Sequence, residues 1–325
     1  MIAHPELRAL RRDDSPQCDA QDALQLAMDD WRAKPHIAAL LAELKCFAAG
    51  AELSDCPGLA GLFTPGTGQA PILAKDFAAT TCTALAAFPL GHVPLRHFTD
   101  GVTSTLLIAR EGNVTLSLVS IDSEGMRHRP ESASASFSPN HTWEYVLGGS
   151  AAVELVTCQP SGPRDATLTR RALDIGPGSI MHRDGQREAR LLHRIDGALV
   201  SLRLQRRQNT AEVTREYDLA SGALLHQAAG NPRDSRIELM LALLGRMGRS
   251  DAAPLMAELA QGEGSTALRW QALRECLALD TLAGFAALAA IAVTPEDALA
   301  GPAGALRAQL VEAHPQLQEV EPCPA

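Results

Sequence analysis

The fold of this chain can be approached from one stretch, Ser138-Pro-Asn-His-Thr-Trp-Glu-Tyr-Val-Leu-Gly-Gly149. Its middle is rich in aromatic and aliphatic residues, which favour strands, and its two glycines favour a turn. The strands expected around that turn are Thr142–Leu147 and Ala151–Thr157. The stretch therefore predicts two neighbouring strands joined at Gly148-Gly149.

Short stretches of strand character continue on both sides of this turn. The sequence Arg110-Glu-Gly-Asn113 is typical of a hairpin turn. Turn signals recur about every 8–12 residues, which favours a sandwich or a barrel over alternating strands and helices. The further expected strands are Val93–His97, Thr103–Ala109, Val114–Ile121, Ser132–Ser138, Ala166–Ala172, Gly178–Arg183, Arg187–Ile195, Ala198–Gln205 and Glu212–Asp218.

The chain before this β region has helical periodicity. Apolar residues at helical spacing predict helices from about Asp19, over 36–49, and over about 74–88. The segment 56–68 is rich in proline and glycine and is expected to form a linker or long loop.

Helical periodicity returns from Asp234, together with a weak internal repeat. Asp251, Ser265 and Asp280 are typical N-cap residues, and Gly248 is a typical helix stop. Two repeated helix pairs indicate either a short HEAT-like stack or an ordinary helical bundle. In the repeat, Leu241, Leu244, Met247, Asp251, Met256 and Leu259 recur twenty-nine residues later as Trp270, Leu273, Cys276, Asp280, Phe285 and Leu288.

Two motifs in the β region resemble those of the cupin superfamily. His141-Thr-Trp-Glu-Tyr-Val-Leu-Gly-Gly149 resembles the end of the first cupin motif, and Leu173-Asp-Ile-Gly-Pro-Gly-Ser-Ile180 resembles the opening of the second. Gly197-Ala-Leu-Val-Ser-Leu-Arg-Leu204 resembles a late cupin strand. The resemblance covers residues 90–218 and implies a double-sheet jelly roll.

The chain departs from the cupin motifs at the positions that hold the metal in that family. The two spaced histidines of the first motif would fall near residues 134–138, where this chain has no histidine. The motif's glutamate position corresponds to His141 or Thr142 of this chain. Arg187-Glu188 stands where the second motif has its histidine. The resemblance therefore implies the fold more strongly than it implies the metal site.

Together these features predict a multidomain α+β fold. A central antiparallel β jelly roll, cupin-like, is expected over 90–218, between an N-terminal helical segment over 1–89 and a HEAT-like helical domain over 231–318.

A divalent metal in such a β domain needs three or four imidazole or carboxylate ligands that converge from neighbouring strands. Glu144 lies on the strand face opposite Trp143 and Tyr145. Either Glu144 points inward and needs a partner, or the two aromatic residues point inward and Glu144 is exposed; burial of large aromatics favours the second alternative. The candidate ligands are His97, His141, Glu144, His182 and His193.

Arginines cluster around the second motif and offer another function. Arginine binds carboxylate and phosphate groups of small ligands through paired N–H donors. The candidate ligand-binding residues are Arg183, Arg187, Arg190, Trp143 and Tyr145.

Composition and charge exclude some classes of partner. A net charge of −9 argues against nucleic acid, and no apolar stretch is long enough to cross a membrane. Seven cysteines without C-x-x-C spacing, and the lack of a secretory signal, favour a reducing compartment, so we expect a cytoplasmic protein. The scarcity of lysine is typical of a GC-rich bacterial genome.

Three functions agree with these features. The first is a cupin-like small-molecule-binding or regulatory protein, whose C-terminal helices dock a protein partner. The second is a divergent metal-dependent cupin dioxygenase that uses Fe(II) or another divalent metal. The third is a structural assembly protein that forms a homodimer through exposed sheet edges.

Overall fold

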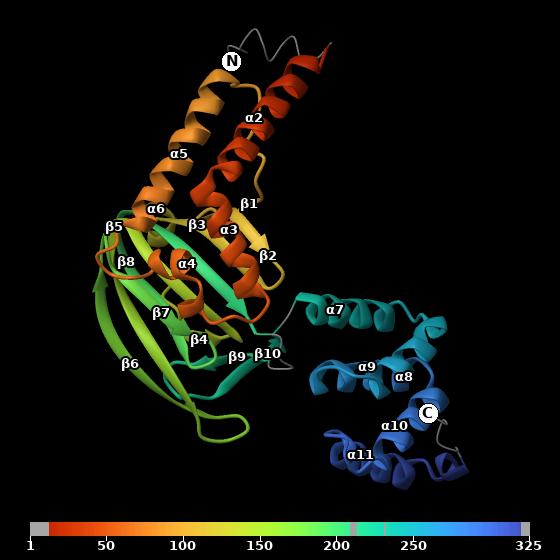
Figure 1. The fold of residues 1–325 in the computed structure, drawn as a ribbon. Helices are drawn as coiled ribbons and strands as arrows, with labels where there is room; N and C mark the ends of the chain where they lie inside the picture. Colours follow the sequence, from red (N-terminus) through yellow and green to blue (C-terminus); the bar gives the residue numbers. More distant parts are fainter. Residues whose placement is uncertain (1–12, 209–212, 231, 320–325) are drawn as a thin grey trace. The chain divides into compact units, whose positions relative to one another are not determined.

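The computed structural model describes residues 13–208, 213–230 and 232–319 (Figure 1). The chain divides into two compact units. One comprises Met1–Gln208 with Tyr217–Ala223, and the other comprises Asn209–Glu216 with Leu224–Ala325. The predicted class, a mixed α+β fold with an antiparallel sheet and helices, is confirmed.

The first unit begins with helices. Proline opens α3 at its first position, where its missing N–H costs no helical hydrogen bond. The segment 56–68, expected to be a loop, contains the short helix α4. The helices of this unit are α2 (Ser15–Ala33), α3 (Pro35–Ala48), η1 (Leu53–Asp55), α4 (Pro57–Gly61), α5 (Gln69–Ala87) and α6 (Ser123–Arg127).

The strands belong to two sheets, and the neighbouring strands of the large sheet pair antiparallel. They are β1 (His97–Thr99), β2 (Thr103–Glu111), β3 (Val114–Asp122), β4 (Ser134–Phe137), β5 (Asn140–Pro160), β6 (Ala166–Ile175), β7 (Ile180–Asp184), β8 (Glu188–Arg207), β9 (Val213–Asp218) and β10 (Leu224–Ala229).

The large sheet has the order β1-β2-β3-β8-β5-β6, and β7 also pairs with β5. The smaller sheet has the order β10-β9-β4. The predicted hairpin between β2 and β3 is confirmed, since Glu111 pairs with Val114 around Gly112, whose φ is +51°. Strand β10 was not predicted, and Glu212, expected to begin β9, lies outside the described residues.

Strands β5 and β8 are longer than the sequence predicts, because each continues through a turn signal. Strand β5 runs through Gly148 and Gly149, and β8 runs through Gly197. The pairing register of the two strands shifts on both sides of Gly148. Gly149 has φ +76°, and a Cβ there would lie 2.1 Å from the carbonyl oxygen of Ala198, so only glycine fits. The glycines therefore produce a bend within one long strand pair.

The N-terminal helices cover one face of the sheet and share a core with it. Phe47 of α3 is fully buried in this core, together with Leu116 of β3 and with Leu202 and Leu204 of β8. In Figure 1, α3 and α4 lie against the strands, and α2 and α5 pack side by side. A second apolar cluster lies on the other face of the sheet and includes Val119, Val146 and Leu199.

The second unit contains helices packed around their own core, in which Phe285 and Leu288 are fully buried. Ser265 caps α9 and Asp280 caps α10 through side-chain oxygens that accept backbone N–H groups, as predicted. The HEAT-like repeat stays a prediction. The elements are α7 (Pro232–Arg246), η2 (Ser250–Ala252), α8 (Ala253–Gln261), α9 (Thr266–Leu279), α10 (Thr281–Ala292), α11 (Ala300–Ala313) and η3 (Pro315–Glu319).

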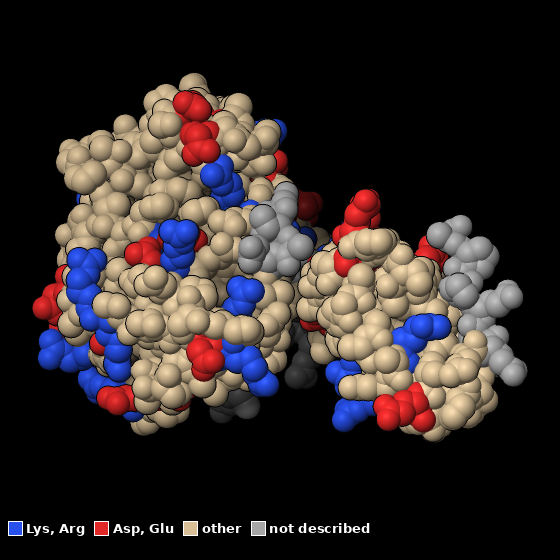
Figure 2. Space-filling view, turned by 90° about the horizontal axis from the view of Figure 1, so that it is seen from below, with Lys and Arg blue, Asp and Glu red and all other residues tan. Residues whose placement is uncertain are grey.

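Two observations bear on the expected partners. Figure 2 shows basic and acidic side chains interspersed among uncharged ones on the face in view. Within the described residues, no helix combines the length and apolar character needed to cross a bilayer.

Candidate functional site: a buried arginine and carboxylate cluster

The two faces of strand β5 have different surroundings. His141, Trp143 and Tyr145 lie on the face toward the N-terminal helices, where Trp143 and Tyr145 pack against the core that contains Phe47. Trp143 and Phe47 meet edge to face, with ring centroids 5.6 Å apart. Glu144 and Val146 lie on the opposite face, and Val146 belongs to the second apolar cluster there. Both faces of β5 are therefore covered.

Glu144 is completely buried, with a relative exposure of 0%. Its two carboxylate oxygens accept hydrogen bonds from three side chains. Arg190 donates to Oε2 at 2.7 Å, the hydroxyl of Ser201 donates to Oε1 at 2.6 Å, and Arg203 donates to Oε1 at 3.3 Å. The favoured expectation that Glu144 is an exposed strand residue is therefore wrong, because these partners satisfy its charge inside the protein.

The contact between Arg190 and Glu144 shows that the sheet folds back on itself. Arg203 lies directly opposite Glu144 in the register of β5 and β8, whereas Arg190 lies opposite Leu155. Leu155 is eleven residues further along β5 than Glu144, roughly 36 Å in a straight strand. Because Arg190 nevertheless bonds to Glu144, the bend at Gly148 and Gly149 must bring the two halves of the strand pair face to face.

The charges around Glu144 control its protonation. Burial alone would raise the pKa of Glu144, but the positive charges of Arg203 and Arg190 and the Ser201 hydrogen bond outweigh burial and hold the pKa at about 2. Glu144 is therefore ionised throughout the physiological range. Burial lowers the pKa of Arg190, and its bond to Glu144 opposes that effect.

Arg183 of β7 adds a third guanidinium to the cluster. It pairs in register with Thr142 of β5, two residues from Glu144 and on the same strand face. Its Nε is fully buried, and no hydrogen bond or ion pair joins the side chain of Arg183 to another described residue. Burial and the neighbouring Arg190 lower its pKa to about 10, which the charge of Glu144 offsets only in part. The cluster therefore holds a partly buried cation without a direct counter-charge among the described residues.

The charge of the cluster is unbalanced as a whole. Three arginines share the single buried carboxylate of Glu144, and the Nε of Arg203 is also buried without a partner in the described part of the chain. Glu188 is the next carboxylate to act on Arg183, and its side chain accepts the backbone N–H of Asp184 at 3.3 Å. The side chain of Arg203 keeps 23% exposure, so the cluster reaches solvent on that side.

The five candidate metal ligands do not converge on one point. His141 and His182 stack with ring centroids 5.8 Å apart, and His182 also stacks on Trp143. Burial of His182 and the neighbouring His141 lower the pKa of His182. His193 instead lies 3.5 Å from Glu154, and His97 is exposed on β1. Glu144 is on the other face of β5 from His141 and is occupied by arginines.

Across residues 13–208, 213–230 and 232–319, no three His, Cys, Asp or Glu side chains lie together in a way that could hold a metal ion. The face of the sheet toward the N-terminal helices has two imidazoles, those of His141 and His182. The opposite face has the carboxylate of Glu144, which is bound by arginines. The arrangement offers no shared position to a metal such as Fe(II).

The structure separates the other candidate ligand-binding residues as well. Arg183 and Arg190 belong to the buried cluster, whereas the side chain of Arg187 is 80% exposed and lies 4.0 Å from Asp184. Trp143 and Tyr145 point toward the helices, away from the arginines. Ser201 and Arg203 were missed, although their alternation with Leu202 and Leu204 along β8 places them on the face opposite those leucines.

Comparison with known proteins gives limited information. No family model matches this chain, and no curated protein matches it. Solved structures that are similar to part of it include a cupin superfamily protein from Desulfitobacterium hafniense, with 13% identity, TM-score 0.23, and coverage of 34% of this chain and 83% of that chain.

Two further solved structures show similarity of the same kind. Pac13, a nucleoside dehydratase from Streptomyces, has 10% identity and a TM-score of 0.26 over 39% of this chain and 88% of that chain. HutD from Pseudomonas fluorescens has 19% identity and a TM-score of 0.24 over 35% of this chain and 57% of that chain. Similarity at this level assigns no activity or ligand to this chain.

Proposed function

We propose that the β domain binds a small anionic molecule, carrying a carboxylate or phosphate group, at the cluster formed by Arg183, Arg190, Arg203 and Glu144. The observation that carries the proposal is the Nε–H of the partly buried Arg183, which is buried and has no hydrogen-bond partner among the described residues. This function is the binding role expected from the arginines around the second cupin-like motif.

The energetic argument starts from the cost of a buried charge. An unpaired ion in the interior costs several kcal/mol even after the surroundings relax. Arg183 has no direct partner among the described residues, and its pKa is lowered to about 10, which shows that its surroundings disfavour the charged form. A bound anion would supply the missing counter-charge. The site is therefore arranged to be stable when an anion is bound.

The residues of the cluster have different roles in this proposal. Arg183 and Arg203 each have a buried Nε–H without a partner among the described residues, and both are only partly buried, so they are the groups proposed to contact the ligand. Glu144 holds Arg190 and Arg203 in place through direct hydrogen bonds. Its negative charge also reduces the repulsion among the three arginines. Glu144 is therefore a positioning residue.

The apolar residues beside the cluster limit the kind of ligand. The second apolar cluster, on the same side of the sheet, contains Val146 and Val119 and has Met181 and Leu192 packed against it. Met181 lies opposite Glu144 in the pairing of β7 with β5. A ligand with one anionic group and a small apolar part would match both regions.

Isothermal titration calorimetry with the purified chain tests the proposal, using inorganic phosphate, succinate and butyrate at low ionic strength. We expect at least one anion to bind, and Arg183→Gln to weaken that binding by at least about tenfold, which equals about 1.4 kcal/mol. The matched control is Arg187→Gln, which removes an exposed arginine four residues away. Equal binding by the Arg183→Gln variant, or no binding of any of these anions to the unaltered chain, would contradict the proposal.

A further inference from the structure

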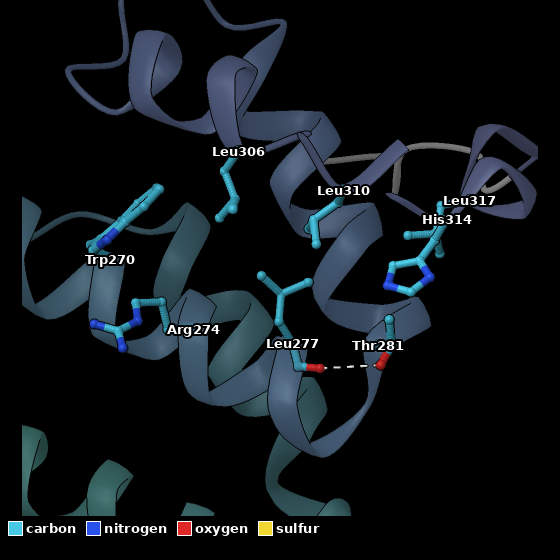
Figure 3. Close-up of a pocket in the computed structure, with 8 residues that line it drawn as sticks. All are labelled: Trp270, Arg274, Leu277, Thr281, Leu306, Leu310, His314 and Leu317. Atoms are coloured by element: carbon cyan, nitrogen blue, oxygen red, sulfur yellow. Dashed lines mark hydrogen bonds between the residues drawn. The ribbon is translucent and has the colours of Figure 1, made fainter. Parts of the chain in front are cut away.

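A pocket lies in the helical unit and contains no residue of the arginine cluster. Its volume is about 570 Å³, and α9, α11 and η3 contribute its walls (Figure 3). Figure 3 shows Trp270 and Arg274 at one end of the pocket, Leu277 and Leu310 in its middle, and His314 at the other end. The pocket is thus elongated, with polar groups at its ends and leucines between them.

The pocket lies between α9 and α11, beside the core of the unit, where Trp270, Leu277, Leu306 and Leu310 pack against that core and stay partly exposed. Helix α9 buries Leu268, Ala272 and Cys276 in the core of the unit. Trp270, Arg274 and Leu277 are spaced four and three residues apart, so they form a separate stripe along the same helix. On α11, Leu306 and Leu310 are four residues apart and only partly buried. Apolar side chains from two helices therefore line a space that no other described residue fills.

Arg274 supplies a charge at one end of this apolar space. Among the described residues, no carboxylate lies within ion-pairing distance of Arg274. Arginine keeps its positive charge at any physiological pH, so the exposed guanidinium of Arg274 favours an anionic group beside Trp270, an attraction that solvent screens in part. No such fixed charge lies among the leucines in the middle of the pocket.

We propose that this pocket binds an elongated apolar molecule with a single carboxylate, such as a medium-chain fatty acid. The carboxylate would pair with Arg274, and the hydrocarbon chain would lie along Leu277, Leu306 and Leu310 toward His314. The volume lies within the roughly 300–1,000 Å³ typical of small-molecule pockets, and such pockets are mostly apolar with a few fixed polar groups. This inference does not depend on the anion site of the β domain.

Calorimetric titration of the full chain with decanoate tests this inference, with decylammonium as a probe of equal length and opposite charge. We expect decanoate to bind and decylammonium to bind at least about tenfold more weakly, because Arg274 attracts one head group and repels the other. Arg274→Gln should weaken decanoate binding about five- to tenfold, and Leu310→Gln should weaken the binding of decanoate through loss of the apolar wall.

Two control variants locate the site. Arg307→Gln removes an exposed arginine of α11 that does not line the pocket, and it should leave decanoate binding unchanged. Arg183→Gln should also leave it unchanged, because that residue belongs to the β domain. The inference is overturned if decanoate does not bind, if decylammonium binds equally well, if Arg274→Gln has no effect, or if Arg183→Gln abolishes decanoate binding.

Discussion

Replacing Glu144 with glutamine would preserve the shape of the side chain and remove its charge. The amide could still accept the Ser201 hydroxyl at Oε1, but its NH₂ group would face the guanidinium of Arg190. The three arginines of the cluster would then lose the buried carboxylate that they share. We expect the variant to be strongly destabilised at neutral pH.

Two independent arguments give the size of this effect. The pKa of Glu144 falls from its ordinary 4.5 to about 2, and a shift of this size corresponds to about 3 kcal/mol of stability at neutral pH. Removing one partner from a buried ion pair typically costs about 3–5 kcal/mol. The free energy of unfolding, measured by urea denaturation at pH 7, should therefore fall by about 3–5 kcal/mol.

Glu154→Gln is the matched control, because Glu154 lies on the same strand and also pairs with an arginine. Its partner Arg170 is 45% exposed, and such pairs contribute about 0–1 kcal/mol. We expect Glu154→Gln to change the free energy of unfolding by less than about 1 kcal/mol. If Glu144→Gln were no more harmful than Glu154→Gln, the account of the buried cluster would be refuted.

Other perturbations test other parts of the structure. The free energy of unfolding of the unaltered chain should fall as pH decreases from about 5 toward 2. The pKa of Glu144 is lower in the folded than in the unfolded chain, so ionised Glu144 stabilises the fold fully above its unfolded pKa, and this stabilisation is lost as pH falls through its folded pKa. Glu144→Gln should flatten this part of the pH profile in denaturant titrations. Gly149→Ala should lower the free energy of unfolding by at least about 2 kcal/mol, because of the positive φ and the close approach of Ala198, whereas Gly148→Ala, with nothing within 4 Å of its Cβ, should cost less in the same urea assay. Phe47→Ala should lower the thermal midpoint and cost about 3–5 kcal/mol, since Phe47 is fully buried between helix and sheet; a loss below about 1 kcal/mol would contradict the shared core.

The fold class could be predicted from the sequence because strands and helices have different apolar periods. Most expected strands coincide with observed ones, and the N-caps at Ser265 and Asp280 are where the residue types predict them. Asp251, also predicted as a cap, instead forms an ion pair with Arg249. The glycines at 148, 149 and 197 were predicted as ends of strands, whereas backbone pairing continues through them and produces a bend.

The candidate site could be predicted only in part. Alternation along β5 correctly separates Glu144 from Trp143 and Tyr145, but it does not say which face is interior. The N-terminal helices cover the face of β5 that has Trp143 and Tyr145, and the folded-back sheet covers the face that has Glu144. Because both faces are covered, the preference of aromatic residues for the interior does not predict whether Glu144 is exposed. The pairing of Glu144 with Arg190 depends on the bend, which no local pattern reveals. Arg183 was a candidate ligand-binding residue from the start, but its lack of a partner is visible only in the structure.

The most direct test of the proposed function is the stability of Arg183→Met, measured by urea denaturation at pH 7 without and with a bound anion. Arg183 is partly buried, and its Nε–H has no partner among the described residues, so replacing it with an apolar side chain should raise the free energy of unfolding without anion by about 1–3 kcal/mol. Adding the anion should then stabilise the unaltered chain and leave the variant unchanged. Loss of stability in Arg183→Met without anion, or equal stabilisation of both proteins by the anion, would contradict an anion site at Arg183.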